Sequence, residues 1–131
     1  MGFLRYWELK QLPNFALAAP TLLLTAFGVA VHARAWLSER GRARMRDGTA
    51  RGLERAQALP YVVLAAALAV QGIVGFHVQI VTRLFTALPA VAWAAAEAYV
   101  HAPAAARAWT VYAVGFGAAS AVLFANFYPP A

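Results

Sequence analysis

The sequence predicts an all-α protein whose helices cross a membrane, and three observations support this class. Of its 131 residues, 63% are hydrophobic and only 12% are charged, whereas a soluble domain carries roughly 25% charged residues. Several apolar runs approach the length of about 20 residues that a helix needs to cross a bilayer. Most of the basic residues stand in one short segment between two such runs. The bilayer is therefore the expected solvent, and the expected architecture is a polytopic transmembrane helical one.

The composition also excludes several functions. The net charge of +6 is concentrated in one loop rather than presented by a soluble module, so we expect no nucleic-acid partner. The absence of cysteine excludes disulfides and thiolate metal sites, and three scattered histidines make no metal centre. No Ser-His-Asp set, zinc-protease motif, phosphate loop or dinucleotide fingerprint occurs in the sequence. We therefore expect neither a metal nor a cofactor.

The chain opens with a predicted interfacial segment that leads into a predicted span. Residues 1–14 mix aromatic with charged side chains, which is typical of a segment in the headgroup region, here on the lumenal side. The first transmembrane helix is predicted over residues 15–36. Pro20 is expected near the start of this helix, where a missing backbone donor costs least.

A basic loop is predicted next, over residues 37–57. Between Arg34 and Gln57 the chain carries seven arginines against three acidic residues, and three glycines interrupt it. We expect a mobile polar loop rather than packed structure, and the positive-inside rule assigns it to the cytosol. A binding site for anionic lipid head groups is the alternative explanation of this charge, at about 1 kcal/mol per basic residue near a charged leaflet.

The second transmembrane helix is predicted over residues 58–76. Pro60 stands at a favourable first-turn position, and Gln71 is the one strongly polar side chain of the run. We expect the Gln71 amide to contact a neighbouring helix. With the basic loop in the cytosol, this helix ends on the lumenal side.

The remainder of the chain is divided into residues 77–107 and a third span over residues 108–127. The first part contains Pro89 and Glu97 in an alanine-rich apolar run. A carboxylate in so short a run favours a lumenal re-entrant or interfacial segment, and a full crossing is the alternative. Small residues of the last span, Gly115 among them, suit close helix packing.

One polar cluster directly follows the second predicted span, with the sequence HVQIVTR at residues 77–83. In a helix, at about 100° per residue, Gln79 and Arg83 share one face and His77 lies on the other. We therefore expect an amphipathic segment at the membrane boundary.

Three blocks of the sequence carry a resemblance to a known family. The block FLRYWELKQLPNF at residues 3–15, continued by LAAP at 17–20, resembles the late segment of the GPI mannosyltransferase 2 (PIG-V) family. Residues 77–83 resemble a second block of that family, and ANFYP at residues 125–129 resembles its C-terminal ending. The blocks stand in family order with apolar spans between them, so the resemblance covers essentially the whole chain.

The resemblance implies a fold and an activity. The fold is that of a GT-C glycosyltransferase, a multi-pass protein of the endoplasmic reticulum membrane. The activity is transfer of the second mannose, in α-1,6 linkage, from dolichol-phosphate mannose to the GPI-anchor precursor at the lumenal face. An accessory membrane subunit is a further expected partner. The family's acidic residue that acts as the catalytic base lies in an N-terminal lumenal loop without a counterpart here, so we expect a C-terminal fragment with no catalytic residue of its own.

The retained residues are then candidates for substrate binding. A lumenal cation would stabilise the phosphate that leaves as mannose transfers, and Arg83 is the first candidate for this, followed by Arg5. Sugar hydroxyls or phosphate would accept hydrogen bonds from His77 and Gln79. The other candidates are Tyr6, Trp7 and Glu8. Helix capping or snorkelling is the structural alternative for all of these residues. The alternative for the whole chain is a non-enzymatic polytopic scaffold or lipid-binding subunit.

Overall fold

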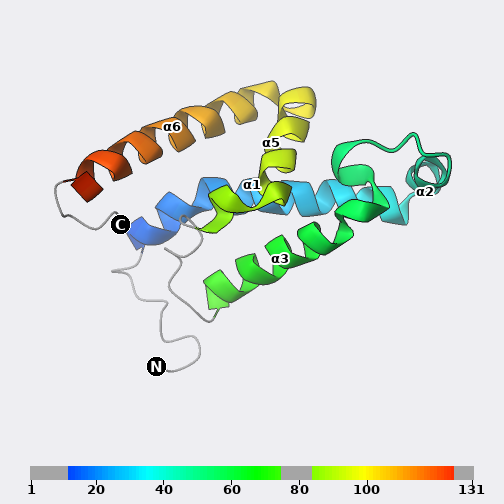
Figure 1. The fold of residues 1–131 in the computed structure, drawn as a ribbon, viewed down its shortest axis with the longest axis horizontal. Helices are drawn as coiled ribbons and strands as arrows, with labels where there is room; N and C mark the ends of the chain where they lie inside the picture. The colour runs from blue at the N-terminus through cyan, green and yellow to red at the C-terminus, as the bar shows by residue number, and fades with distance from the viewer. Residues whose placement is uncertain (1–11, 75–83, 126–131) are drawn as a thin grey trace.

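The computed structural model describes residues 12–74 and 84–125, and no strand occurs within these ranges. The all-α class is therefore confirmed. Helices make up most of the described chain (Figure 1). The elements, in chain order, are α1 (Leu12–Leu37), α2 (Glu39–Arg46), the 3₁₀ turns η2 (Gly52–Glu54) and η3 (Ala56–Ala58), α3 (Leu59–Val74), the 3₁₀ turn η4 (Phe85–Ala87), α5 (Pro89–His101) and α6 (Pro103–Ala125).

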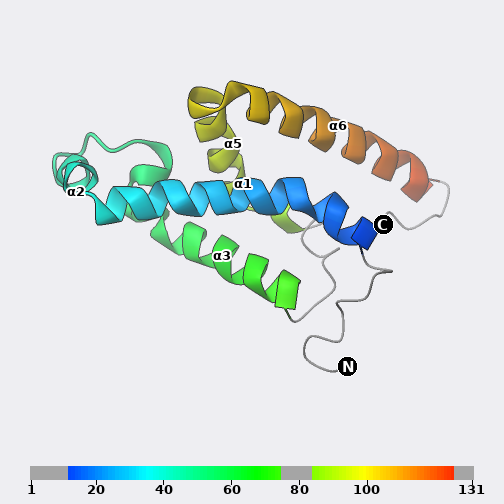
Figure 2. The same ribbon diagram turned by 180° about the vertical axis from the view of Figure 1, so that it is seen from behind.

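Helix α1 is the central element of the fold. Both views show α3 along one side of α1 and α6 on the other, with α5 packed against α1 and leading into α6 (Figures 1 and 2). Two helical stretches of the described chain, Leu12–Leu37 and Ala56–Val74, are long and apolar enough to cross a membrane, with mean hydropathies of 1.8 and 1.7. Many large apolar side chains on α1, α3 and α6 face outward, including Leu23 and Val111, as expected where the surrounding solvent is lipid.

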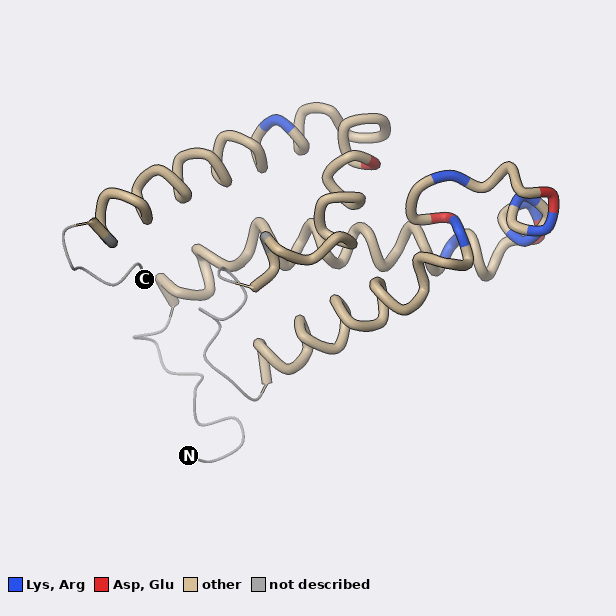
Figure 3. The backbone as a smooth tube through the Cα atoms, viewed as in Figure 1, with Lys and Arg blue, Asp and Glu red and all other residues tan. Residues whose placement is uncertain are grey.

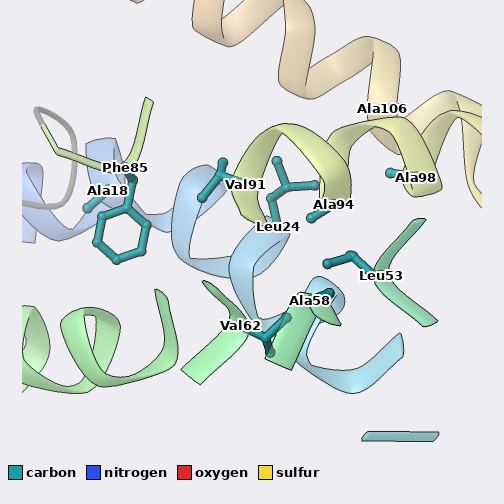
Figure 4. Packing of buried hydrophobic residues seen from close by; sticks show 10 residues of the cluster. All are labelled: Ala18, Leu24, Leu53, Ala58, Val62, Phe85, Val91, Ala94, Ala98 and Ala106. Carbon is teal, nitrogen blue, oxygen red and sulfur yellow. The ribbon is translucent and has the colours of Figure 1, made fainter. Parts of the chain in front are cut away.

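The buried core is small and rich in alanine (Figure 4). Its largest fully buried side chains are Phe85 and Leu53. Small residues let the helices approach closely: a Cβ added to Gly28 of α1 would lie 2.8 Å from the Ala94 Cβ of α5. This is the small-residue packing that membrane helices use, since close van der Waals contact replaces the hydrophobic driving force there.

The position of Pro20 differs from its expected place near the start of a helix. Helix α1 begins at Leu12, so Pro20 lies two turns inside it. The helix continues through the proline, although the residue supplies no backbone N–H to the preceding turn. The Tyr112 hydroxyl of α6 donates a hydrogen bond to the Leu17 carbonyl in that turn. This hydroxyl is a donor close to the position where Pro20 supplies no N–H.

The expectation of a mobile basic loop is wrong, because residues 39–58 are folded and packed (Figure 3). Ser38 caps α2 by accepting a hydrogen bond from the Gly41 N–H at 3.0 Å. The Arg42 guanidinium donates to the carbonyls of Trp36 and Leu37, at 3.1 and 3.2 Å. Leu53 is fully buried against the helices. Local capping and one apolar anchor thus outweigh the polar composition of the segment.

Two expected packing contacts are not made within the described residues. The Gln71 side chain is exposed on α3 rather than packed against a neighbouring helix. Gly115 and Gly117 of α6 have open space where a Cβ would be. Gln71 of α3 and the two glycines of α6 lie on outer faces, because α1 and α5 provide the close contacts of the bundle.

Helix α5 reaches the basic segment. Its first residue is Pro89, at a favourable first-turn position, and Glu97 lies near its last turn. The Glu97 Oε1 atom is 2.5 Å from the position of a Cβ on Gly52, a residue with φ of +51° that glycine adopts without strain. The contact joins the end of α5 to the segment predicted to be cytosolic. The lumenal re-entrant or interfacial position of residues 77–107 and the crossing alternative both stay predictions.

Candidate functional site

The substrate-binding residues predicted from the sequence all lie outside the described residues. Leu12 and Val74, the helix ends that border these stretches, lie at the same end of the molecule (Figure 1). The residues concerned, which stay predictions, are Arg83, His77, Gln79, Arg5, Tyr6, Trp7 and Glu8.

An apolar groove lies between α1, α5 and α6, with a volume of about 390 Å³. Small-molecule sites typically span about 300–1,000 Å³ and combine an apolar lining with a few polar groups. Two polar tips, on Trp109 and Tyr112, occur in this lining. The lining residues are Pro20, Leu23, Leu24, Phe27, Ala98, Ala102, Ala105, Ala108, Trp109 and Tyr112.

The two polar tips differ in their hydrogen bonds. The Tyr112 hydroxyl donates to the Leu17 carbonyl at 2.5 Å, and the Thr21 side chain contacts the same hydroxyl. The Trp109 Nε1 atom is buried and has no partner among the described residues. A buried indole N–H without an acceptor is costly. The groove therefore has an apolar surface, and one buried donor beside it has no acceptor among the described residues.

A second polar contact joins α1 to the basic segment. His32 is 4% exposed, and its Nδ1 atom lies 2.5 Å from the Leu53 carbonyl oxygen. A carbonyl can only accept, so Nδ1 carries the proton. The His32 Nε2 atom is buried and has no partner within the described part of the chain. The contact fixes η2 against α1, which makes His32 a structural anchor.

The acidic residue of α5 forms a helical pair near this anchor. The Glu97 Oε2 atom lies 3.5 Å from the Nε2 atom of His101, one turn further along α5. The His101 side chain is 61% exposed and the Glu97 side chain 18%, so water screens the pair. No group of three His, Cys, Asp or Glu residues within residues 12–74 and 84–125 could hold a metal ion. The groove between α1, α5 and α6 has the size and the apolar lining of a ligand site, and the described residues show no catalytic arrangement.

Sequence reasoning missed both His32 and the groove. His32 follows Gly28 by one helical turn, and this spacing places it on the packed face of α1. A histidine in such a register within an apolar run signals a buried polar contact. The sequence contains no comparable signal for the groove, because the alanines that line it on α5 and α6 face α1 residues about eighty positions away in the sequence.

The fold and its groove define a helical protein with two membrane-length helices and an apolar site of ligand size. A family model described as mannosyltransferase (PIG-V) matches residues 1–131. The chain belongs to this family, as its three sequence blocks predicted.

Curated relatives support the assignment. The chain is 35% identical over its full length to GPI mannosyltransferase 2 of Chaetomium globosum, of which it spans 27%. It is 38% identical over 71% of its length to human GPI alpha-1,6-mannosyltransferase 2, of which it spans 21%. The Drosophila melanogaster GPI mannosyltransferase 2 is 32% identical over 98% of the chain, which spans 30% of that protein. The chain thus spans less than a third of each of these relatives. No solved structure matches it.

Proposed function

We propose that this chain forms the C-terminal membrane part of a mannosyltransferase with the GT-C fold. The enzyme transfers the second mannose, in α-1,6 linkage, from dolichol-phosphate mannose to the GPI-anchor precursor at the lumenal face of the endoplasmic reticulum. The observation that carries the proposal is the family match over residues 1–131. The names of the relatives, GPI mannosyltransferase 2 and GPI alpha-1,6-mannosyltransferase 2, support the linkage and the acceptor.

In this proposal the chain contributes binding rather than the catalytic base. The groove between α1, α5 and α6 is apolar and of ligand size, which suits the hydrocarbon part of a lipid-linked substrate. Arg83 supplies positive charge to the phosphate that departs from mannose, because a fixed cation in a site that excludes water stabilises developing negative charge. The catalytic base belongs to a lumenal loop outside this chain.

The experiment uses cells that lack the endogenous enzyme and express the full-length polypeptide containing this chain. Arg83→Ala is expected to lower the amount of GPI-anchored protein at the cell surface while the expression level stays unchanged. Arg83→Lys keeps the cation and is expected to retain part of the activity. Loss of the polypeptide itself in the Ala variant would support a structural function of Arg83 instead. Full surface levels in that variant would count against the phosphate assignment.

The groove is tested by filling it. Ala105 lines the groove, whereas its exposed neighbour Ala104 does not. Ala105→Phe is expected to raise the apparent KM for the lipid-linked donor in microsomes, because the added ring occupies the space of the hydrocarbon chain. Ala104→Phe places the same ring outside the groove and serves as the matched control. Equal effects of the two variants would contradict the assignment of the groove, and unchanged transfer in both would do so as well.

A non-enzymatic scaffold is the competing function, and one further expression experiment addresses it. Residues 1–131 expressed alone in the same cells are expected to give no rescue, because the proposed catalytic base lies outside them. Restored surface GPI-anchored protein by residues 1–131 alone would overturn the proposed division of labour. A full-length polypeptide that never restores GPI-anchored protein would favour the scaffold.

A further inference from the structure

A groove of about 850 Å³ lies where α2 folds back against the end of α1, remote from the groove between α1, α5 and α6. Its lining contains three arginines and one glutamate, together with the edge of an indole. Within the described residues, neither Arg40 nor Arg46 forms an ion pair or a hydrogen bond. The lining residues are Trp36, Glu39, Arg40, Arg42, Ala43, Met45, Arg46 and Ala56.

The walls of this groove are fixed by contacts on both sides. A Cβ on Gly41 would collide with the Ala35 backbone, so α2 packs against α1 without any intervening side chain. The third arginine, Arg42, is held by its two hydrogen bonds to the last carbonyls of α1. Arg44 is neutralised outside the groove by Glu54 at 2.5 Å. Two cations, Arg40 and Arg46, are thus left unpaired on a short helix whose position is set by packing.

The position of α2 matches a membrane surface. Figure 3 shows the charged residues gathered at this end of the molecule, and α2 is seen end-on where α1 runs across the view. A helix transverse to a spanning helix lies along the plane of the bilayer. The residues next to it are exposed and apolar: Trp36 is 42% exposed and Leu37 80%. An exposed tryptophan beside arginines is typical of the boundary between hydrocarbon and head groups.

We infer that this groove binds the phosphate-bearing head group of an anionic phospholipid from the surrounding leaflet. Guanidinium groups suit phosphate because their N–H groups match its oxygens in bidentate hydrogen bonds. Glu39 opposes this attraction at one edge, but Arg40, Arg42 and Arg46 outnumber it. The positive-inside rule depends on the number of basic residues in the segment. It requires neither a groove, nor a capped helix, nor the close packing of Gly41. The charge of this segment therefore has a local ligand in addition to its effect on topology.

The experiment uses the cysteine-free 131-residue chain in phosphatidylcholine nanodiscs. Ala56→Cys introduces one thiol at an exposed position in the groove, and a fluorophore attached there reports nearby spin-labelled lipid by quenching. Spin-labelled phosphatidylserine is expected to quench more strongly than spin-labelled phosphatidylcholine. Arg40→Gln/Arg46→Gln is expected to reduce this preference on the order of thirtyfold, which follows from about 1 kcal/mol for each basic residue.

Two matched variants make the result specific. Arg51→Gln/Arg107→Gln removes the same charge outside the groove and is expected to keep most of the preference. Arg40→Lys/Arg46→Lys retains the charge and is expected to keep part of the preference, and hydrogen exchange in α2 that is equal in the Gln variant and the unsubstituted chain shows that the loss in the Gln variant is not caused by unfolding. Equal quenching by the two lipids in the unsubstituted chain would overturn the inference. Equal loss in the Arg51/Arg107 control would also overturn it, and so would displacement of the lipid by inorganic phosphate at millimolar concentration.

Discussion

Replacing His32 by alanine is expected to release the basic segment from α1. The substitution removes the donor to the Leu53 carbonyl, and both residues are buried. A buried carbonyl left without a donor costs about 1–3 kcal/mol, before any cost of the cavity. Since about 1.4 kcal/mol corresponds to a factor of ten, the open population of the segment is expected to rise by about five- to 140-fold.

Limited proteolysis measures this opening. Arg51 and Arg55 flank Leu53, and trypsin cleaves after arginine. When the segment recloses faster than it is cut, the cleavage rate follows the open population. Cleavage at these two sites is therefore expected to accelerate in His32→Ala, in the chain reconstituted in nanodiscs. His32→Asn places an amide N–H near the position of Nδ1 and is expected to recover part of the protection.

His101→Ala is the matched control for His32→Ala. His101 is largely exposed, and its pairing with Glu97 at 3.5 Å is worth less than about 1 kcal/mol. Its loss is expected to change cleavage by only a small factor. Unchanged cleavage in His32→Ala, or an equal acceleration in His101→Ala, would refute the anchoring function of His32.

Two further predictions concern glycines. Gly28→Ala is expected to destabilise the bundle by up to about 2 kcal/mol, because overpacking costs about 1–3 kcal/mol and the gain in helix propensity offsets about 1 kcal/mol of it. Thermal unfolding in detergent measures the change in stability. The double variant Gly28→Ala/Ala94→Gly should recover most of the loss, and no recovery would contradict the importance of the contact between the two positions. Gly41→Val is expected to detach α2, because its side chain would collide with the Ala35 backbone; hydrogen exchange should then rise in α2, and unchanged protection would contradict tight packing there.

The fold class could be predicted because its signal is local. The helix of the second apolar run was expected over residues 58–76, and α3 with its preceding turn occupies Ala56–Val74. The position of α2 was not predicted, because the glycines and charges of its segment are also typical of a polar loop. Ser38 was the available signal, since a serine before a run of helix formers is a preferred N-cap. The burial of Leu53 depends on α1 and α5, which the local sequence does not contain.

The candidate site could be predicted only to a limited extent. The family resemblance pointed to residues in the stretches 1–11 and 75–83, which lie outside the described residues, so their assignment stays a prediction. The described groove depends on alanines of α5 and α6 that face α1. Alanine is common on all sides of these helices, so no periodic pattern distinguishes the lining face. The groove thus arises from tertiary packing and required the structure.

The contact between Glu97 and Gly52 bears on the path of the polypeptide. The chain departs along α1, returns along α3, and reaches the basic segment again at the end of α5. Helix α6 then runs back toward the end where α1 begins (Figure 2). The basic segment is thus tied to a helix that precedes it and to one that follows it in the sequence, so its position depends on the assembly of the described helices as a whole.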